Sequence, residues 1–301
     1  MNEIIAFIGL GNMGGPMAVN LKNAGFKVHG VDISDANRAA AARNGIAAGA
    51  SVAEAINGAA AVITMLPTGK HVKSVWAEIL STVKPGTLLI DCSTIEVEVA
   101  VHLHAAGGQH GCLTLDAPVS GGVGGATAGS LTFMVGASQP AFDRASAILQ
   151  AMGKRIVRCG DAGAGQTAKV CNNMVLGITM AGVAEAFVLG EKLGLSHQAL
   201  YDVLSTSSGQ CWAVTTYCPV PGPVPTSPAN NDYKPGFAGA LMLKDLRLAQ
   251  SAAQSVGSPT PVGAVASQLY ELFGQLGYGG EDFSAIIKLL RGALTDEGSR
   301  S

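Results

Sequence analysis

The sequence has few charged residues and no cluster of positive charge. Asp, Glu, Lys and Arg make up 13% of the 301 residues, about half of the roughly 25% that is usual in soluble domains. The net charge is -2 and no run of Lys or Arg occurs, so we expect no nucleic-acid partner. Because so little charge leaves much of the surface apolar, we expect other subunits to cover part of it in a homo-oligomer.

Patterns that indicate several other chemistries are absent. The six cysteines form no Cys-x-x-Cys pair and no compact framework, which is typical of reduced thiols in the cytoplasm. The six histidines show no His-Glu-x-x-His or other metal-ligand spacing, so we predict no metal site. Gly-x-Ser-x-Gly does not occur, which leaves a hydrolase nucleophile elbow without support. No basic segment precedes an apolar one at the start, so we predict no secretory signal.

The most apolar segment, MVLGITMAGVAEAFVLG (174–190), nearly has the length of a membrane span. Thr179 and Glu185 interrupt it, and no basic flank follows. We therefore expect a buried helix and no contact with a membrane.

Short apolar runs alternate with helix-like segments from the start of the chain to about residue 160. Continuous apolar strands separated by helices are typical of a parallel sheet that is covered on both faces. Ser51 and Ser93 each stand three residues before a glutamate, a spacing that predicts capping boxes at two helix starts. The predicted strands are 4–10, 27–33, 60–66, 87–93, 113–118 and 130–136.

Beyond Gly160 the sequence shows helical patterns and no convincing strand ladder. Residues 215–236 contain six prolines, which cannot belong to a long helix. They predict a long ordered loop or a lid, because loops of that length are usually functional or disordered. Helical patterns resume after this segment.

A glycine-rich loop follows the first predicted strand. Gly9-x-Gly11-x-x-Gly14 lies between that strand and a helix, and such glycines permit a tight turn, a close approach of backbone N–H groups to a pyrophosphate, and close helix packing. This context predicts a dinucleotide-binding domain. The residues of the predicted pyrophosphate loop are Gly9, Leu10, Gly11, Asn12, Met13 and Gly14.

Asp32 ends the second predicted strand, at the distance along the chain where dinucleotide sites place their ribose-binding acid. We expect its carboxylate to accept hydrogen bonds from the ribose hydroxyls and to repel a 2′-phosphate. Since no arginine follows before Arg38, NAD is favoured over NADP. An ordinary cap for the helix that starts near Ser34 is the alternative role of Asp32.

Two further strand ends are expected to face the cofactor. Met65, Leu66 and Pro67 end one strand, and the segment 91–94 ends the next. Ligands of open parallel sheets bind outside the carboxyl ends of the strands. The plainer alternative is that each segment only turns the chain.

Three segments indicate a site for a small anionic substrate. Ser120, Gly121 and Gly122 follow another strand, and a hydroxyl with exposed N–H groups suits a carboxylate or phosphate. Lys169 and Asn173 are spaced i,i+4 and so share a helix face. A lysine can act as general base only when its pKa falls toward neutrality, which burial and a nearby positive nicotinamide would both favour. A snorkelling or salt-bridged lysine is the alternative.

Five segments, in order along nearly the whole chain, resemble the signature regions of the β-hydroxyacid dehydrogenases. SSGQCWAVTTYCPVPG (207–222) and the last of the five are similar to the 3-hydroxyisobutyrate dehydrogenase branch in particular. The five segments are GLGNMGGPMAVNL (9–21), DCSTI (91–95), DAPVSGG (116–122), GAGQTAKVCNN (163–173) and GFAGALMLKDLRLAQ (236–250).

The resemblance implies an α/β Rossmann-type N-terminal domain, residues 1–162, that binds NAD. It also implies an all-α C-terminal domain, residues 163–301, joined by a long helix and serving substrate binding and assembly into dimers or tetramers. It implies that Lys169 is the catalytic base. The implied substrate contacts are Ser120, Gly121, Gly122, Asn173 and Trp212, with Tyr217 nearby, and the implied cofactor contacts include Leu66, Pro67, His71, Thr94 and Lys244.

The resemblance implies NAD-dependent oxidation of 3-hydroxyisobutyrate to its semialdehyde in valine breakdown. Serine, 3-hydroxypropionate and glycerate remain alternative substrates, because one methyl group changes binding by only about 1–3 kcal/mol. A phosphogluconate-type enzyme would need a larger helical domain, and imine-reducing relatives replace the lysine. A catalytically silent NAD-binding protein would have no need to keep Lys169, Asn173 and Ser120 together.

Overall fold

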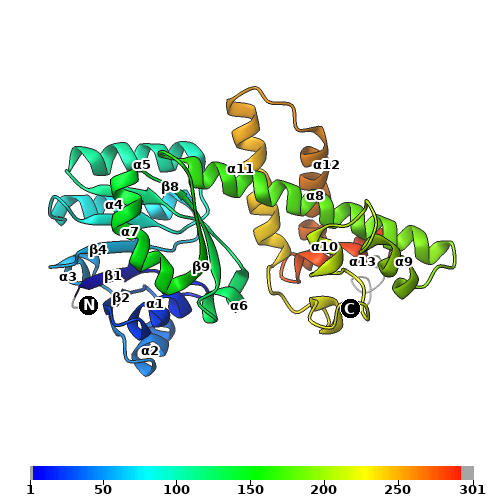
Figure 1. The fold of residues 1–301 in the computed structure, drawn as a ribbon, viewed down its shortest axis with the longest axis horizontal. Coiled ribbons are helices and arrows are strands. Elements are labelled where there is room, and N and C mark those ends of the chain that lie inside the picture. Colours follow the sequence, from blue (N-terminus) through cyan, green and yellow to red (C-terminus); the bar gives the residue numbers. More distant parts are fainter. Residues whose placement is uncertain (1–2, 293–301) are drawn as a thin grey trace. The chain divides into compact units, whose positions relative to one another are not determined.

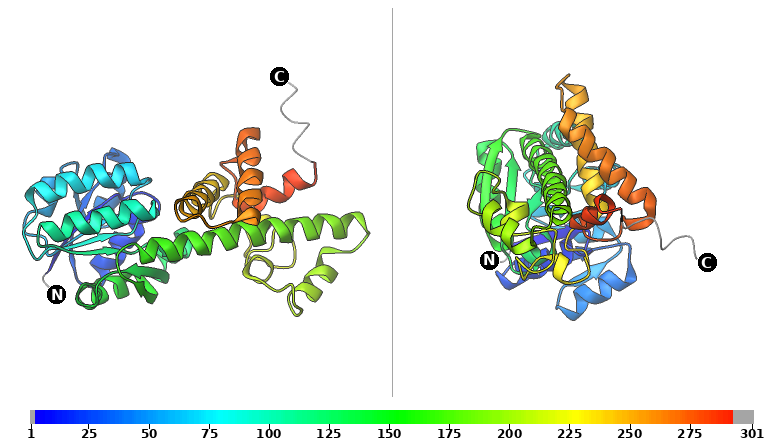
Figure 2. Two further views of the ribbon diagram at one scale, coloured as in Figure 1. Left: turned by 90° about the horizontal axis from the view of Figure 1, so that it is seen from above. Right: turned by 90° about the vertical axis from the view of Figure 1, so that its right-hand side faces the viewer.

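The computed structural model describes residues 3–292, and the chain divides into two compact units, 1–169 and 170–301. The division falls within the long helix α8 (Ala164–Lys192), which runs without interruption from the first unit into the second (Figure 2). The sequence-based domain boundary between residues 162 and 163 stays a prediction.

In the described residues of the first unit, nine strands form one sheet (Figure 1). The strand order is β3-β2-β1-β4-β5-β6-β8-β7, and β9 pairs with β8. All pairs from β3 to β6 are parallel, whereas β8 runs antiparallel to β6 and β7. The strands are β1 (Ile4–Ile8), β2 (Lys27–Val31), β3 (Ala47–Gly49), β4 (Ala61–Thr64), β5 (Leu88–Asp91), β6 (Leu113–Asp116), β7 (Val119–Ser120), β8 (Leu131–Gly136) and β9 (Gly153–Gly160).

Alternate residues of β1 belong to two cores, one on each face of the sheet. Ile5 and Phe7 pack with α1 and α7, whereas Ala6 and Ile8 pack with α3, α4 and α5. This two-sided burial explains the continuous apolar runs in the sequence. The predicted sheet with helices on both faces is confirmed, and it is parallel from β1 to β6, whereas the predicted strand 130–136 (β8) runs antiparallel to β6. The helices are α1 (Gly14–Asn23), α2 (Asp35–Arg43), α3 (Val52–Ile56), α4 (Gly69–Thr82), α5 (Val97–Gln109), α6 (Gly122–Thr127) and α7 (Gln139–Met152).

The structure differs from the sequence-based expectations in two further respects. All six predicted strands are present, but β3, β7 and β9 are additional. The hydroxyl of Ser51 accepts a hydrogen bond from the N–H of Glu54 at 3.2 Å, as its capping box predicts. The prediction for Ser93 is wrong, because α5 begins only after Glu96 and the hydroxyl of Ser93 bonds to Asp91 instead.

The described part of the second unit is helical and surrounds its own core. The largest fully buried side chains of this core are Phe187, Tyr270, Phe273 and Phe283. By length and composition alone α8 could cross a membrane, and half of its most apolar window is buried inside the protein. The other elements are α9 (His197–Leu204), α10 (Trp212–Thr215), η1 (Pro228–Asn230), α11 (Gly239–Ser255), α12 (Pro261–Phe273), η2 (Gly274–Tyr278), η3 (Phe283–Ala285) and α13 (Ile286–Leu290).

The proline-rich segment 215–236 is an ordered loop, with the short helix η1 inside it. Its side chains Cys218, Val220 and Tyr233 are buried in the core of the second unit. Asp282 holds its end, because Oδ2 accepts hydrogen bonds from the Tyr217 hydroxyl at 2.9 Å and from the N–H groups of residues 236 and 237 at 3.0 and 3.1 Å. Side-chain packing in the core and hydrogen bonds to the buried Asp282 carboxylate therefore hold this loop in place.

A second buried carboxylate, Asp91, lies at the end of β5 in the first unit. Its Oδ1 accepts hydrogen bonds from the hydroxyls of Ser93 at 2.6 Å and Thr64 at 2.7 Å. Burial raises the pKa of the Asp91 carboxyl to about 6, against these hydrogen bonds, and the negative charge of Asp116 adds to the rise. The protein is therefore less stable toward unfolding when Asp91 is ionised than when it is protonated.

We predict that Asp91→Asn removes this pH-dependent cost. In the wild-type protein the cost grows as the pH rises from the ordinary pKa of 3.8 to about 6 and stays constant above that. Relative to wild type, the free energy of unfolding of the variant should therefore rise by about 2 to 3 kcal/mol between about pH 4 and pH 7. Urea unfolding followed by Trp76 fluorescence in a Trp212→Phe background measures this difference.

The matched control is Asp143→Asn, at an exposed carboxylate of α7. A difference between Asp91→Asn and wild type that stays the same at both pH values would show that Asp91 does not titrate differently on folding.

Candidate active site

Neighbouring parallel strands end together at one edge of the sheet. Ile8 of β1 is in register with Thr64 of β4, Thr64 with Asp91 of β5, and Asp91 with Asp116 of β6. The strand order reverses at β1, which lies between β2 and β4. Ligands of open α/β sheets bind outside the carboxyl ends at such a point. Most residues of the predicted site lie in the loops that leave this edge.

Two positions of the β1–α1 loop have no room for a side chain and therefore require glycine. A Cβ at Gly9 would lie 2.2 Å from the carbonyl oxygen of Met65, and one at Gly14 would lie 1.9 Å from the carbonyl oxygen of Gly9. A Cβ at Gly11 would meet no protein atom within 4 Å. Open space beside exposed backbone at a helix start fits a pyrophosphate, so this loop can hold a dinucleotide. The other loop residues are Leu10, Asn12 and Met13.

Asp32 follows β2 and faces the same loop. Its Oδ2 accepts a hydrogen bond from the N–H of Leu10 at 2.7 Å, and its Oδ1 accepts one from the N–H of Ser34 at 2.8 Å. The helix cap of α2 is Ser34, not Asp32. Arg38 donates to the carbonyl oxygen of Asp32 at 2.6 Å and pairs with Asp35, so a basic group lies nearer to Asp32 than the sequence spacing indicated.

The next two strand ends are tied to each other by a side chain. Leu66 and Pro67 follow β4, and Thr94 follows β5. The hydroxyl of Ser93 accepts a hydrogen bond from the N–H of Leu66 at 2.9 Å. His71 is exposed in the first turn of α4, where its Nδ1 contacts the capping hydroxyl of that helix at 2.7 Å. These predicted cofactor residues thus belong to two adjacent loops of one sheet edge.

The substrate side of the first unit combines a glycine turn with a buried amine. Gly121 and Gly122 follow Ser120 with φ of 130° and 60°, values that favour glycine. Lys169 is only 7% exposed, and its Nζ donates a hydrogen bond to the carbonyl oxygen of Val119 at 2.8 Å. The buried amine is therefore held at the backbone immediately before the Ser120 hydroxyl and the glycine turn.

Asp116 holds the start of the helix that carries Lys169. Its Oδ1 accepts a hydrogen bond from the N–H of Gly163, and its Oδ2 accepts one from the N–H of Gln166, both at 2.8 Å. The ring of His104 contacts Oδ1 at 2.9 Å. Sequence reasoning missed these roles, although a carboxylate at the end of an apolar strand was a visible signal.

In the second unit, a chain of polar contacts fixes the carboxamide of Asn173. The Oδ1 of Asn173 accepts a hydrogen bond from Asn172 Nδ2 at 2.9 Å, and the Nδ2 of Asn173 donates one to Asp245 Oδ2 at 2.5 Å. Lys244 Nζ lies 3.3 Å from Asp245 Oδ1. Lys169 and Asn173 lie one turn apart on α8. Asp245, which the sequence placed only beside Lys244, thus orients Asn173.

Trp212 lies at the start of α10 with 47% of its surface exposed. It stacks on Tyr217 with a centroid distance of 4.8 Å and an interplanar angle of 20°. Burial raises the pKa of the Tyr217 phenol, and the charge of Asp282 adds to the rise, so this phenol stays protonated. The two rings form an apolar face, and the hydrogen bond from the Tyr217 hydroxyl to Asp282 holds the tyrosine ring in place.

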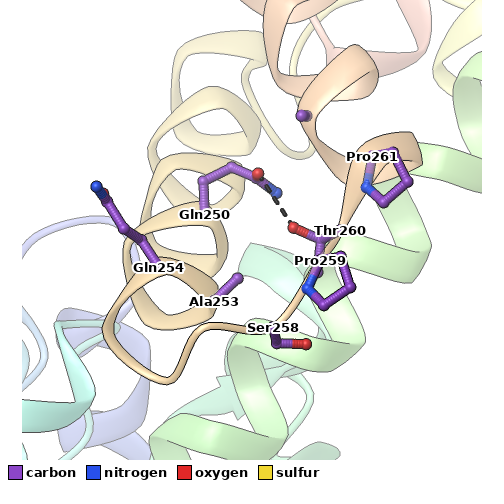
Figure 3. A pocket seen from close by; sticks show the side chains of 8 residues that line it. Gln250, Ala253, Gln254, Ser258, Pro259, Thr260 and Pro261 are labelled. Carbon is purple, nitrogen blue, oxygen red and sulfur yellow. Dashed lines mark hydrogen bonds between the residues drawn. The ribbon is translucent and has the colours of Figure 1, made fainter.

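A hollow of about 520 Å³ lies elsewhere in the second unit, between the end of α11 and the start of α12. Thr260 Oγ1 donates to Gln250 Oε1 across it at 3.2 Å (Figure 3). It has no ionisable lining residue, so it cannot supply acid–base chemistry. Among residues 3–292, no group of three His, Cys, Asp or Glu side chains is placed to hold a metal ion.

Two family models together match nearly the whole chain. The NAD binding domain of 6-phosphogluconate dehydrogenase matches residues 4–160. The NAD-binding domain of NADP-dependent 3-hydroxyisobutyrate dehydrogenase matches residues 163–290. Both models assign a nicotinamide dinucleotide to the chain, and the cofactor is NAD.

Relatives match along the same length. A probable 3-hydroxyisobutyrate dehydrogenase of Mycobacterium tuberculosis is 53% identical, covering 95% of this chain and 97% of its own. An NAD-dependent L-serine dehydrogenase of Pseudomonas aeruginosa is 46% identical, covering 95% and 97%. A structure of Mycobacterium tuberculosis 3-hydroxyisobutyrate dehydrogenase with L-serine has a TM-score of 0.94 and 52% identity, covering 97% of this chain and all of that one.

Identity at this level over both halves extends the motif resemblance to at least 95% of the chain. The chain belongs to the 3-hydroxyisobutyrate dehydrogenase family of β-hydroxyacid dehydrogenases, which are NAD-dependent oxidoreductases acting on a CH–OH group.

Proposed function

We propose that this protein oxidises 3-hydroxyisobutyrate to methylmalonate semialdehyde with NAD+, as a cytoplasmic step of valine breakdown. The observation that carries the proposal is the buried amine of Lys169, held 2.8 Å from the Val119 carbonyl beside Ser120 and the glycine turn. A proton acceptor next to an anion-binding turn is what oxidation of a hydroxy acid requires.

Lys169 is the general base of this reaction. Ser120 and the N–H groups of Gly121 and Gly122 bind the substrate carboxylate, and Asn173 and Trp212 are further proposed substrate contacts. Lys169, as a neutral amine, accepts the hydroxyl proton at Nζ as the carbinol carbon loses its hydride and becomes a carbonyl. NAD+, when bound, supplies the hydride acceptor. In the reverse direction Lys169 returns the proton.

The proposed NAD site uses the loops of the sheet edge. Residues 9–14 bind the pyrophosphate and Asp32 binds the ribose. Leu66, Pro67, His71 and Thr94 line the remaining length of the cofactor, and Lys244 is a further proposed cofactor contact. NAD is preferred over NADP because the carboxylate of Asp32 would face a 2′-phosphate. Arg38 does not offset this repulsion, since Asp35 and the Asp32 carbonyl already occupy its guanidinium.

Serine is the second candidate substrate. It carries the same β-hydroxyl and carboxylate, and an ammonium group replaces the methyl group of 3-hydroxyisobutyrate. A relative that is 46% identical is named an L-serine dehydrogenase, and a 52% identical structure is described with L-serine. Of the two, 3-hydroxyisobutyrate is favoured because a probable 3-hydroxyisobutyrate dehydrogenase is 53% identical to this chain, against 46% for the serine dehydrogenase.

We further propose that residues 1–162 form the NAD domain and residues 163–301 the substrate and oligomerisation domain. The second unit exposes large apolar side chains that a homodimer or homotetramer would cover. We predict a dimer or a larger assembly in analytical ultracentrifugation, and a monomer at micromolar concentration would contradict this. The exposed side chains include Val175, Leu189, Leu193, Val203, Val262 and Val265.

The proposed reaction is tested by initial rates of NAD+ reduction. The panel contains both 3-hydroxyisobutyrate enantiomers, both serine enantiomers, 3-hydroxypropionate and glycerate, with NADP+ measured in parallel. We predict the largest kcat/KM for one 3-hydroxyisobutyrate enantiomer with NAD+, at least about tenfold above serine, which corresponds to 1.4 kcal/mol in transition-state binding.

A profile that favours serine would keep the site and its lysine chemistry but reject 3-hydroxyisobutyrate as the substrate. A preference for NADP+ would reject the proposed role of Asp32.

A further inference from the structure

Gln166 lies in the first turn of α8, and its side chain spans a loop of the sheet edge. The residue is completely buried. Its Nε2 donates to the carbonyl oxygen of Ser93 at 2.7 Å, and its Oε1 accepts from the N–H of Ile95 at 3.2 Å. One carboxamide thus forms paired hydrogen bonds with the backbone on both sides of Thr94, the proposed cofactor residue.

The backbone of Gln166 is fixed as firmly as its side chain. Asp116 accepts its N–H at 2.8 Å. The neighbouring Gly165 leaves no room between helix and sheet, because a Cβ there would lie 2.4 Å from the carbonyl oxygen of Met134. The backbone of Gln166 is therefore bonded to the end of β6, at a point where the helix start lies as close to the strands as glycine allows.

The loop that Gln166 holds is itself part of a larger network. Ser93 donates its hydroxyl proton to Asp91 and accepts the N–H of Leu66. The hydroxyl of Thr64 also donates a hydrogen bond to the Asp91 carboxylate, and it accepts one from the indole N–H of Trp76 at 3.2 Å. Both proposed cofactor loops, after β4 and after β5, are thereby linked to the side chain of Gln166.

Lys169 follows Gln166 by three residues on the same helix and is held at the Val119 carbonyl. We propose that Gln166 is a positioning residue, which sets the distance between the cofactor loop at Thr94 and the amine of Lys169. This inference rests on the proposed function. Hydride and proton leave the same CH–OH group, so an error in this distance slows the reaction even when cofactor and substrate are bound.

Two variants distinguish a positioning role of Gln166 from a purely structural one, in which its side chain only forms hydrogen bonds to buried backbone groups. Gln166→Met removes both hydrogen bonds at similar volume. Gln166→Glu keeps an acceptor for the Ile95 N–H, but its carboxylate cannot donate to the Ser93 carbonyl. When protonated, the same side chain again offers a donor and an acceptor, as glutamine does.

For Gln166→Met we expect kcat to fall by about 10- to 100-fold, with the Kd for NAD+ changed less than about threefold. The deuterium isotope effect with substrate deuterated at the carbinol carbon should increase, because hydride transfer becomes more rate-limiting. For Gln166→Glu the rate relative to wild type should recover as the pH falls, and that of Gln166→Met should not.

Ile46→Ala is the control for lost stability. Ile46 is buried just before β3, the outermost strand on the side of the sheet away from β6. Exposed Gln198→Met controls for the substitution itself. If Gln166→Met lowers the melting temperature like Ile46→Ala but leaves kcat and the isotope effect at wild-type values, Gln166 is only structural and the proposal is wrong.

Amide hydrogen exchange tests the coupling without turnover. In Gln166→Met, segments 93–97 and 163–170 should both exchange faster than in wild type. Faster exchange in 93–97 alone would overturn the proposal. Absence of wild-type activity on every hydroxy acid would reject the proposed function instead, and the exchange result would still decide whether Gln166 couples the two segments.

Discussion

The site depends on one buried carboxylate, Asp116 at the end of β6. By accepting the N–H groups of Gly163 and Gln166, it fixes the first turn of α8 at the edge of the sheet. A buried carboxylate is stable only when such donors surround it, and here the donors are the unpaired N–H groups that every helix start presents. The same two hydrogen bonds therefore satisfy the buried carboxylate and two N–H groups of the helix start, and they set where Lys169 lies.

From this anchor the polar network extends along the sheet edge. Gln166 joins α8 to the loop after β5, and Ser93 joins that loop to the one after β4. The glycines of the β1–α1 loop complete the edge, with Gly11 leaving open the space that a pyrophosphate needs. Such hydrogen bonds hold the loops and the helix start in one arrangement, which is what the proposed hydride and proton transfer requires.

The sequence predicted the fold where local pattern and burial agree. The six apolar runs are strands because both faces of the sheet are covered. β9 was missed because Lys154, Arg155 and Arg158 interrupt its apolar pattern, and β7 has only two residues. Ser93 has the spacing of a cap, but its hydroxyl is used by Asp91 and Leu66, a tertiary choice that sequence spacing cannot reveal.

The candidate site was predictable in its residue types and not in its connections. Lysine at the start of an apolar helix indicated a buried amine, yet its partner is a carbonyl oxygen 50 residues earlier. Gln166 and Asp116 lie within the recognised segments, but only the folded chain brings them together. Long-range hydrogen bonds of this kind leave no periodic signal in the sequence.

Whether Lys169 carries the proton is decided by the variant Lys169→Ala. Lys192→Ala, at an exposed lysine of the same helix, is the control. The measurement is the single-turnover rate of NAD+ reduction, alongside the Kd for NAD+. We expect the rate of Lys169→Ala to be lower by about 10²- to 10⁴-fold, with the NAD+ affinity unchanged and with a wild-type rate in the control. A near-normal rate in Lys169→Ala would contradict it.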